Sequence, residues 1–113
     1  MVIKMQAGNV PVTIDVRVTG QVLWRYVYYG EDFTYDDAGT NSGVHTHVMG
    51  LPQELRLGYN EWRATLTNQG AATVACQVDF TWRQGETTLA TWSKPLDLPS
   101  GAVAVVSGSA TLA

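Results

Sequence analysis

The chain has 113 residues, of which 45% are hydrophobic and only 15% are charged. This size and apolar content predict one domain, spanning 1–113, whose core needs neither a disulfide nor a structural metal. The formal net charge is −3 and the basic residues are scattered along the chain, which excludes the basic footprint of a nucleic-acid-binding protein.

The first ten residues lack the sustained apolar stretch and the small-residue cleavage site of a secretory signal. All apolar runs are strand-sized and fall short of the ~20 residues that a membrane-spanning helix needs. We therefore expect no membrane span, and a cytoplasmic protein or a component of a virion or other assembly unless a signal was removed. The single cysteine, Cys76, cannot form an internal disulfide and is expected to be a buried apolar residue.

Alternation of apolar and polar residues is the main structural signal, because residues two apart point to the same face of a strand. In chain order, the predicted strands cover 10–18, 21–29, 44–49, 53–57, 62–67, 73–82, 87–92 and 102–112. No segment has helical periodicity. We therefore expect an all-β protein: an antiparallel β-sandwich, immunoglobulin-like or jelly-roll-like, with about seven to eight strands.

The connections carry residues typical of turns. Thr19 and Gly20 join the first two strands, which predicts a hairpin. Residues 30–43 are rich in Asp, Asn and Gly and predict a mainly irregular exposed loop, inside which Phe33 and Tyr35 can form a short strand. Three further connections are predicted: one with positive φ at Asn68-Gln69-Gly70, a turn at Gln84-Gly85, and a segment through Pro95 and Pro99.

The second half of the chain carries a recurring domain pattern. It reads Trp62-x-x-x-Leu66-x-Asn68-x-Gly70, an alternating strand, a Gln84-Gly85 hairpin, and Leu98-Pro99-Ser100-Gly101 before the last strand. This pattern resembles bacterial immunoglobulin-like domains of the cell-adhesion-related kind, and it covers about half of the chain. The resemblance implies a non-catalytic module. The paired cysteines and central Trp of antibody domains are not matched.

The sharpest chemical signal is the His-x-His motif of His45 and His47, which places two imidazoles on one face of a strand. Together with Glu54 they can form a ligand set for zinc or iron. The local order resembles the first metal motif of cupins, with a longer spacing and no third His: Gly39, His45, His47, Glu54 and Gly58. The alternative is that both His lie on a solvated face, opposite Val44 and Val48.

The acidic segment supplies oxygen ligands of the kind that calcium prefers, without the spacing of an EF-hand: Glu31, Asp32, Asp36, Asp37 and Asn41. The alternative is that these side chains cap local backbone and stay hydrated. No carboxylate pair across a cleft, nucleophile elbow or phosphate-binding loop is recognisable, so an enzyme is the less expected class.

The strand at 21–29 is apolar on both faces. Its large aromatic residues, Trp24, Tyr26 and Tyr28, share one face and are expected in the core. Leu23, Val27 and Tyr29 share the other face, which predicts an outer surface covered by a subunit or partner.

Three functions follow from these patterns. The first is a non-catalytic interaction module without a cofactor, which acts by self-assembly as a homo-oligomer or by docking to a protein partner. The second is a lectin-like carbohydrate-binding module, directly or through calcium, with ligand residues Tyr29, Asp32, Tyr35, Asp36, Asp37 and Tyr59. The third is a cupin-like metal site at His45, His47 and Glu54.

Overall fold

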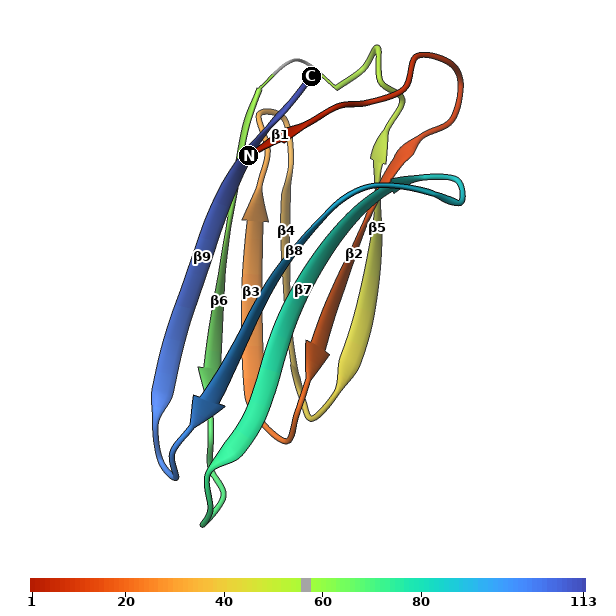
Figure 1. Cartoon of the computed structure of the whole chain (residues 1–113). Coiled ribbons are helices and arrows are strands. Elements are labelled where there is room, and N and C mark those ends of the chain that lie inside the picture. Colours follow the sequence, from red (N-terminus) through yellow and green to blue (C-terminus); the bar gives the residue numbers. More distant parts are fainter. Residues whose placement is uncertain (56–57) are drawn as a thin grey trace.

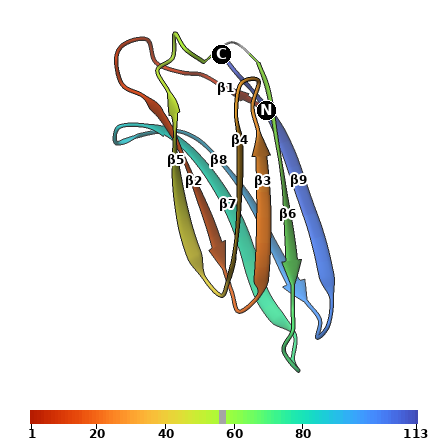
Figure 2. The same cartoon turned by 180° about the vertical axis from the view of Figure 1, so that it is seen from behind.

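A computed structural model describes residues 1–55 and 58–113, and the described chain is all-β without any helix (Figure 1). The strands are β1 Val2–Ile3, β2 Val12–Thr19, β3 Leu23–Tyr29, β4 Thr34–Thr40, β5 Gly43–Gly50, β6 Tyr59–Thr67, β7 Val74–Gln84, β8 Thr87–Leu98 and β9 Val103–Leu112. Their two sheets pack face to face, as the opposite view in Figure 2 also shows. The predicted sandwich architecture is therefore confirmed.

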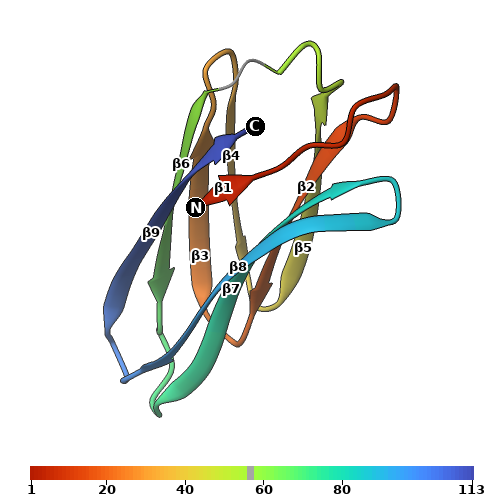
Figure 3. The same ribbon diagram turned by 45° about the horizontal axis from the view of Figure 1, so that its top comes forward.

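The five-stranded sheet has the order β1-β9-β6-β3-β4, and the four-stranded sheet has the order β5-β2-β7-β8. All neighbouring strands are antiparallel except β1 and β9, which bring the two termini close together (Figure 3). Strands β4 and β5 are lateral edges of different sheets and lie on the same side of the sandwich. This arrangement places residues of both sheets along one seam.

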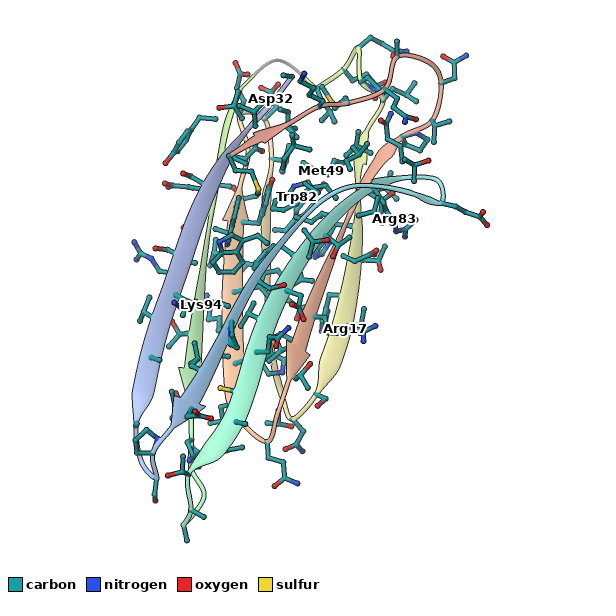
Figure 4. All side chains as sticks on the ribbon, in the orientation of Figure 1. Arg17, Asp32, Met49, Trp82, Arg83 and Lys94 are labelled. Carbon is teal, nitrogen blue, oxygen red and sulfur yellow. The ribbon has the colours of Figure 1, made fainter. Side chains whose placement is uncertain are left out.

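The core consists of the inward-facing side chains of both sheets, as the alternation predicts. Trp24, Trp62, Phe80 and Trp82 are all buried. Tyr28 of the five-stranded sheet stacks on Trp62, and its hydroxyl accepts a hydrogen bond of 3.1 Å from the indole N–H of Trp82 in the four-stranded sheet. This bond joins the two layers at the centre of the molecule, where Figure 4 labels Trp82.

The predicted hairpin at Thr19 and Gly20 is wrong, because β2 and β3 belong to different sheets. The chain crosses between the sheets here, beside a second crossing from β4 to β5. The Gly20 N–H donates to the Ser42 hydroxyl, and the Asn41 N–H donates to the Val22 carbonyl. Alternation reveals the faces of a strand and not its neighbours, so both arrangements fit the sequence.

The predicted loop at 30–43 is largely a strand, since β4 occupies Thr34–Thr40 and pairs with β3 along its whole length. Gly39 lies on the inner face against Trp24, where a Cβ atom would come within 2.5 Å of the indole ring. Tertiary pairing therefore overrides a composition that favours turns.

Other predictions are confirmed or corrected locally. The Gln84-Gly85 turn closes the β7–β8 hairpin, with Gly85 at φ 58°. In the connection between β6 and β7, the Asn68 side-chain oxygen accepts a hydrogen bond from the Gly70 N–H. Neither residue has the positive φ that the sequence predicted. Residues 52–55 form a turn where a strand was predicted, while 56–57 lie outside the described residues. Pro95 stands inside β8, which is possible because β8 is an edge strand.

Candidate functional site

The predicted interface residues lie on the outer face of the five-stranded sheet. Leu23, Val27 and Tyr29 alternate along β3 with buried aromatic residues, so the inner set anchors the strand and the outer set faces away from the core. Leu23 and Val27 are half-buried, and Tyr29 is 46% exposed.

Strand β9 adds two valines to this face that the sequence analysis missed. Val103 and Val105 are each 60% exposed. Val103 lies in the same cross-strand row as Leu23, with Thr67 between them. The sequence feature that could have revealed them is the unbroken run of small apolar residues at 102–106, because such a run places apolar side chains on both faces of the strand, as in β3. We define the apolar outer face by these residues and the exposed Tyr59: Leu23, Val27, Tyr29, Tyr59, Val103 and Val105.

A hollow of about 350 Å³ opens on the same side of the molecule, across β3, β6 and β9. It is lined by Tyr29 and Tyr59 together with polar side chains, namely Glu61, Arg63, Ser107 and Ser109. Of the predicted carbohydrate-binding residues, the structure brings only Tyr29 and Tyr59 together here.

The remaining predicted ligand residues are dispersed, because β4 sends consecutive side chains to opposite faces. Asp36 lies on the outer side and forms an ion pair of 2.8 Å with Arg25. Asp37 turns inward. Asp32 borders a separate cavity of about 150 Å³, and Tyr35 packs inside on a histidine. The acidic segment is therefore not one cluster.

The two histidines lie on the inner side of β5, so the interpretation that places them on the solvated face is wrong. Val44 and Val48 take the outer positions and are 56% and 64% exposed. The Nδ1 atom of His45 lies 2.6 Å from Asp37 Oδ2. Edge positions between two sheets are only half-buried, so polar rings fit there with partners nearby.

His47 has a different set of partners from the same seam. Its Nε2 atom shares a hydrogen bond of 2.7 Å with the Tyr26 hydroxyl, and its ring stacks on Tyr35 at 4.2 Å between centroids. Burial lowers the pKa of His47 and raises the pKa of Tyr26, so both groups are neutral near pH 7. We call this cluster the histidine seam: Tyr26, Tyr35, Asp37, His45 and His47.

The structure does not assemble the predicted metal ligands. Within residues 1–55 and 58–113, no three His, Cys, Asp or Glu side chains are placed to hold one metal ion. Glu54 instead accepts a hydrogen bond from the Leu51 N–H and closes the turn after β5. Since Nε2 of His47 is engaged by Tyr26, the residues present do not fit a bound zinc or iron.

The outer face of the four-stranded sheet is polar along β2 and β7, whereas its edge strand β5 exposes Val44 and Val48. Asp15 of β2 forms an ion pair of 2.6 Å with Arg83 of β7 and accepts a hydrogen bond from Thr46 of β5. Asp79 accepts further hydrogen bonds from Gln77 and Ser93. Figure 4 labels Arg17 and Arg83 on this sheet. Asp15 and Asp79 therefore find their partners within the sheet itself.

Fold and surfaces together define a two-layer, all-β protein whose outer faces differ: one has paired charges near its centre, and the other exposes apolar residues of β3 and β9. Comparison with protein-family models, with curated proteins and with solved structures finds no match. The resemblance to bacterial immunoglobulin-like domains stays a prediction. No helix in the described part of the chain is long and apolar enough to cross a membrane.

Proposed function

We propose that this protein is a non-catalytic structural or accessory module that assembles with copies of itself through the apolar outer face. The observation that carries this proposal is the contrast between the two outer faces. The four-stranded sheet pairs Asp15 with Arg83 near its centre and exposes Val44 and Val48 at its edge, whereas the five-stranded sheet exposes Tyr29 on β3 and Val103 and Val105 on β9. These apolar residues flank the polar row of β6, and protein interaction surfaces commonly combine exposed apolar residues with polar groups.

The charges on this face favour a second copy as the partner. Glu61 and Arg63 are exposed at alternate positions of β6, between the apolar residues of β3 and β9. In a twofold arrangement the same patch meets itself in reverse, so Glu61 of one copy can face Arg63 of the other. Arg25 and Asp36 on the same outer face are already paired with each other.

Light scattering after size exclusion, at several protein concentrations, tests the proposal. We expect a defined oligomer for the native protein and a lower mass for the double variant Val27→Asp and Tyr29→Asp. Val48→Asp is the control on the other sheet, because Val48 is 64% exposed on the outer face of the four-stranded sheet. A monomeric native protein, or an unchanged mass in the double variant, would contradict self-assembly. A mass gain only with a different protein would indicate docking instead.

Carbohydrate binding is a second candidate, favoured by the hollow between Tyr29 and Tyr59. Exposed Tyr rings can stack on sugar rings, and the Glu61, Arg63 and Ser107 side chains at the same hollow can bond hydroxyls. Because the acidic residues of the predicted calcium site are dispersed, we propose that sugar binds at this hollow directly and without calcium.

A glycan array tests this second function. We expect binding that is equal in calcium and in chelator and that is lost in Tyr59→Ala. Thr46→Ala, on the opposite face of the molecule, should bind like the native protein. An array without binding in either condition would exclude this function.

A further inference from the structure

Strand β9 has one paired edge and one largely unpaired edge. It pairs with β6 from Val103 to Thr111. On its other side, the described residues offer only β1, which pairs with Thr111 and Leu112. The edge from Val103 to Ser109 therefore faces solvent, at the margin of the five-stranded sheet (Figure 3).

This edge differs from the edges formed by β8 and β4. Edge strands normally carry charges, prolines or bulges that prevent pairing with another chain. Strand β8 carries Lys94, Pro95 and Asp97, and β4 carries Asp36 and Asp37. The segment 101–113, which contains β9, has no charged residue and no proline.

The hydrogen-bonding groups on this edge have a fixed parity. The Leu112 N–H donates to Gly58 on the β6 side, whereas the N–H groups of Thr111 and Ala113 donate to Met1 and Ile3 on the β1 side. Main-chain groups alternate in direction along a strand. The N–H and C=O groups of the odd-numbered residues therefore point to the free edge: Val103, Val105, Ser107 and Ser109.

We infer that β9 pairs antiparallel with β9 of a second copy, joining the two five-stranded sheets into one continuous sheet. This inference rests on the proposed self-assembly and adds an edge-to-edge contact to the contact through the apolar outer face. With Val106 on the twofold axis, Val105 faces Ser107 of the second copy and Val103 faces Ser109. All four residues are odd-numbered, so each pair can exchange two main-chain hydrogen bonds. Pairing ends before Thr111, where β1 is bound.

Three features favour a second copy over an unrelated peptide. The edge is already an ordered strand, so pairing two such edges avoids the entropy cost of ordering a free peptide. The absence of charge removes like-charge repulsion between identical strands. Pairing also brings together Val103 and Val105 of both copies, so the apolar outer face becomes continuous across the dimer.

The test compares Ser107→Pro with Ser107→Ala in the full-length protein. Proline removes the Ser107 N–H, which points to the free edge and not to β6. We expect Ser107→Pro to lose the edge contact and to form a smaller oligomer than the native protein, with the apparent dissociation constant of the edge contact raised more than tenfold. Ser107→Ala keeps the N–H and should keep the native mass. Circular dichroism checks that both variants are folded.

The outcomes separate this inference from the proposed function. A Ser107→Pro variant of native mass, together with a Val27→Asp/Tyr29→Asp variant of lower mass, would overturn edge pairing and leave self-assembly standing. A native protein that is monomeric at every concentration would overturn both.

Hydrogen exchange provides a second measurement if Ser107→Pro does not fold. In the native protein we expect the amides of Val103, Val105, Ser107 and Ser109 to be protected at high concentration and to exchange faster on dilution. Fast exchange of these amides at all concentrations would overturn the inference, because edge pairing must bury them in hydrogen bonds.

Discussion

The Tyr26 hydroxyl and the Nε2 atom of His47 lie 2.7 Å apart and link β3 of the five-stranded sheet to β5, an edge strand of the four-stranded sheet. His47 also stacks on Tyr35, whose hydroxyl donates to the Val48 carbonyl. The β4–β5 side of the sandwich is therefore held by polar and aromatic contacts, whereas the centre is held mainly by apolar packing.

We expect stability to fall as the pH drops below about 6.5, the ordinary value for histidine. Burial lowers the pKa of His47 in the folded protein, so the unfolded chain takes up the proton first. The contribution of His47 to the free energy of unfolding is complete above the pKa that His47 has in the unfolded chain. It is lost as the pH falls toward the lower pKa that His47 has in the folded protein. Urea titrations between pH 8 and 5 measure this effect. His47→Gln should flatten the decline, and an unchanged slope in that variant would assign the decline to other groups.

The Tyr28–Trp82 hydrogen bond predicts a measurable loss on removing one hydroxyl. Tyr28→Phe leaves the buried indole N–H of Trp82 without its acceptor, which should cost about 1–3 kcal/mol of unfolding free energy. Tyr29→Phe removes the same atom from an exposed ring and should stay within about 0.5 kcal/mol of the native protein. Equal stabilities of the two variants in denaturant titration would refute this role for the bond.

Gly108 is predicted to be intolerant of even one methyl group. It lies opposite Trp62 in the β6–β9 pair, and a Cβ atom there would come within 2.6 Å of the indole ring. Gly108→Ala should destabilise the protein by about 1–3 kcal/mol through overpacking. The neighbouring Ser109→Ala is the control, because Ser109 is exposed. Retention of native stability by Gly108→Ala would mean that the ring can move aside freely.

The thiol of Cys76 should be inert in the native protein. Cys76 is 5% exposed, and burial raises its pKa, so little reactive thiolate forms near pH 7. A chromogenic disulfide reagent should react slowly under native conditions and rapidly in denaturant. Rapid modification without denaturant would show that this end of the core opens readily.

The sequence by itself determined the strands and the division of each strand into two faces. The period of two placed Leu23, Val27 and Tyr29 together, opposite Trp24 and its aromatic neighbours, and the structure confirms that division. This information is local, because side-chain direction along a strand depends only on the backbone of that strand.

Tertiary structure alone decided which strands are neighbours and which face of an ambiguous strand turns inward. In β5 the alternation placed Val44 and Val48 on one face and the two histidines on the other. Hydrophobicity favoured the valines for the interior, but they are exposed and the histidines turn inward. The histidines turn inward because β5 lies at an edge opposite β4, where Asp37, Tyr26 and Tyr35 supply their partners. Those partners lie on β3 and β4, which are other strands. The alternation within one strand does not show which other strand will lie beside it.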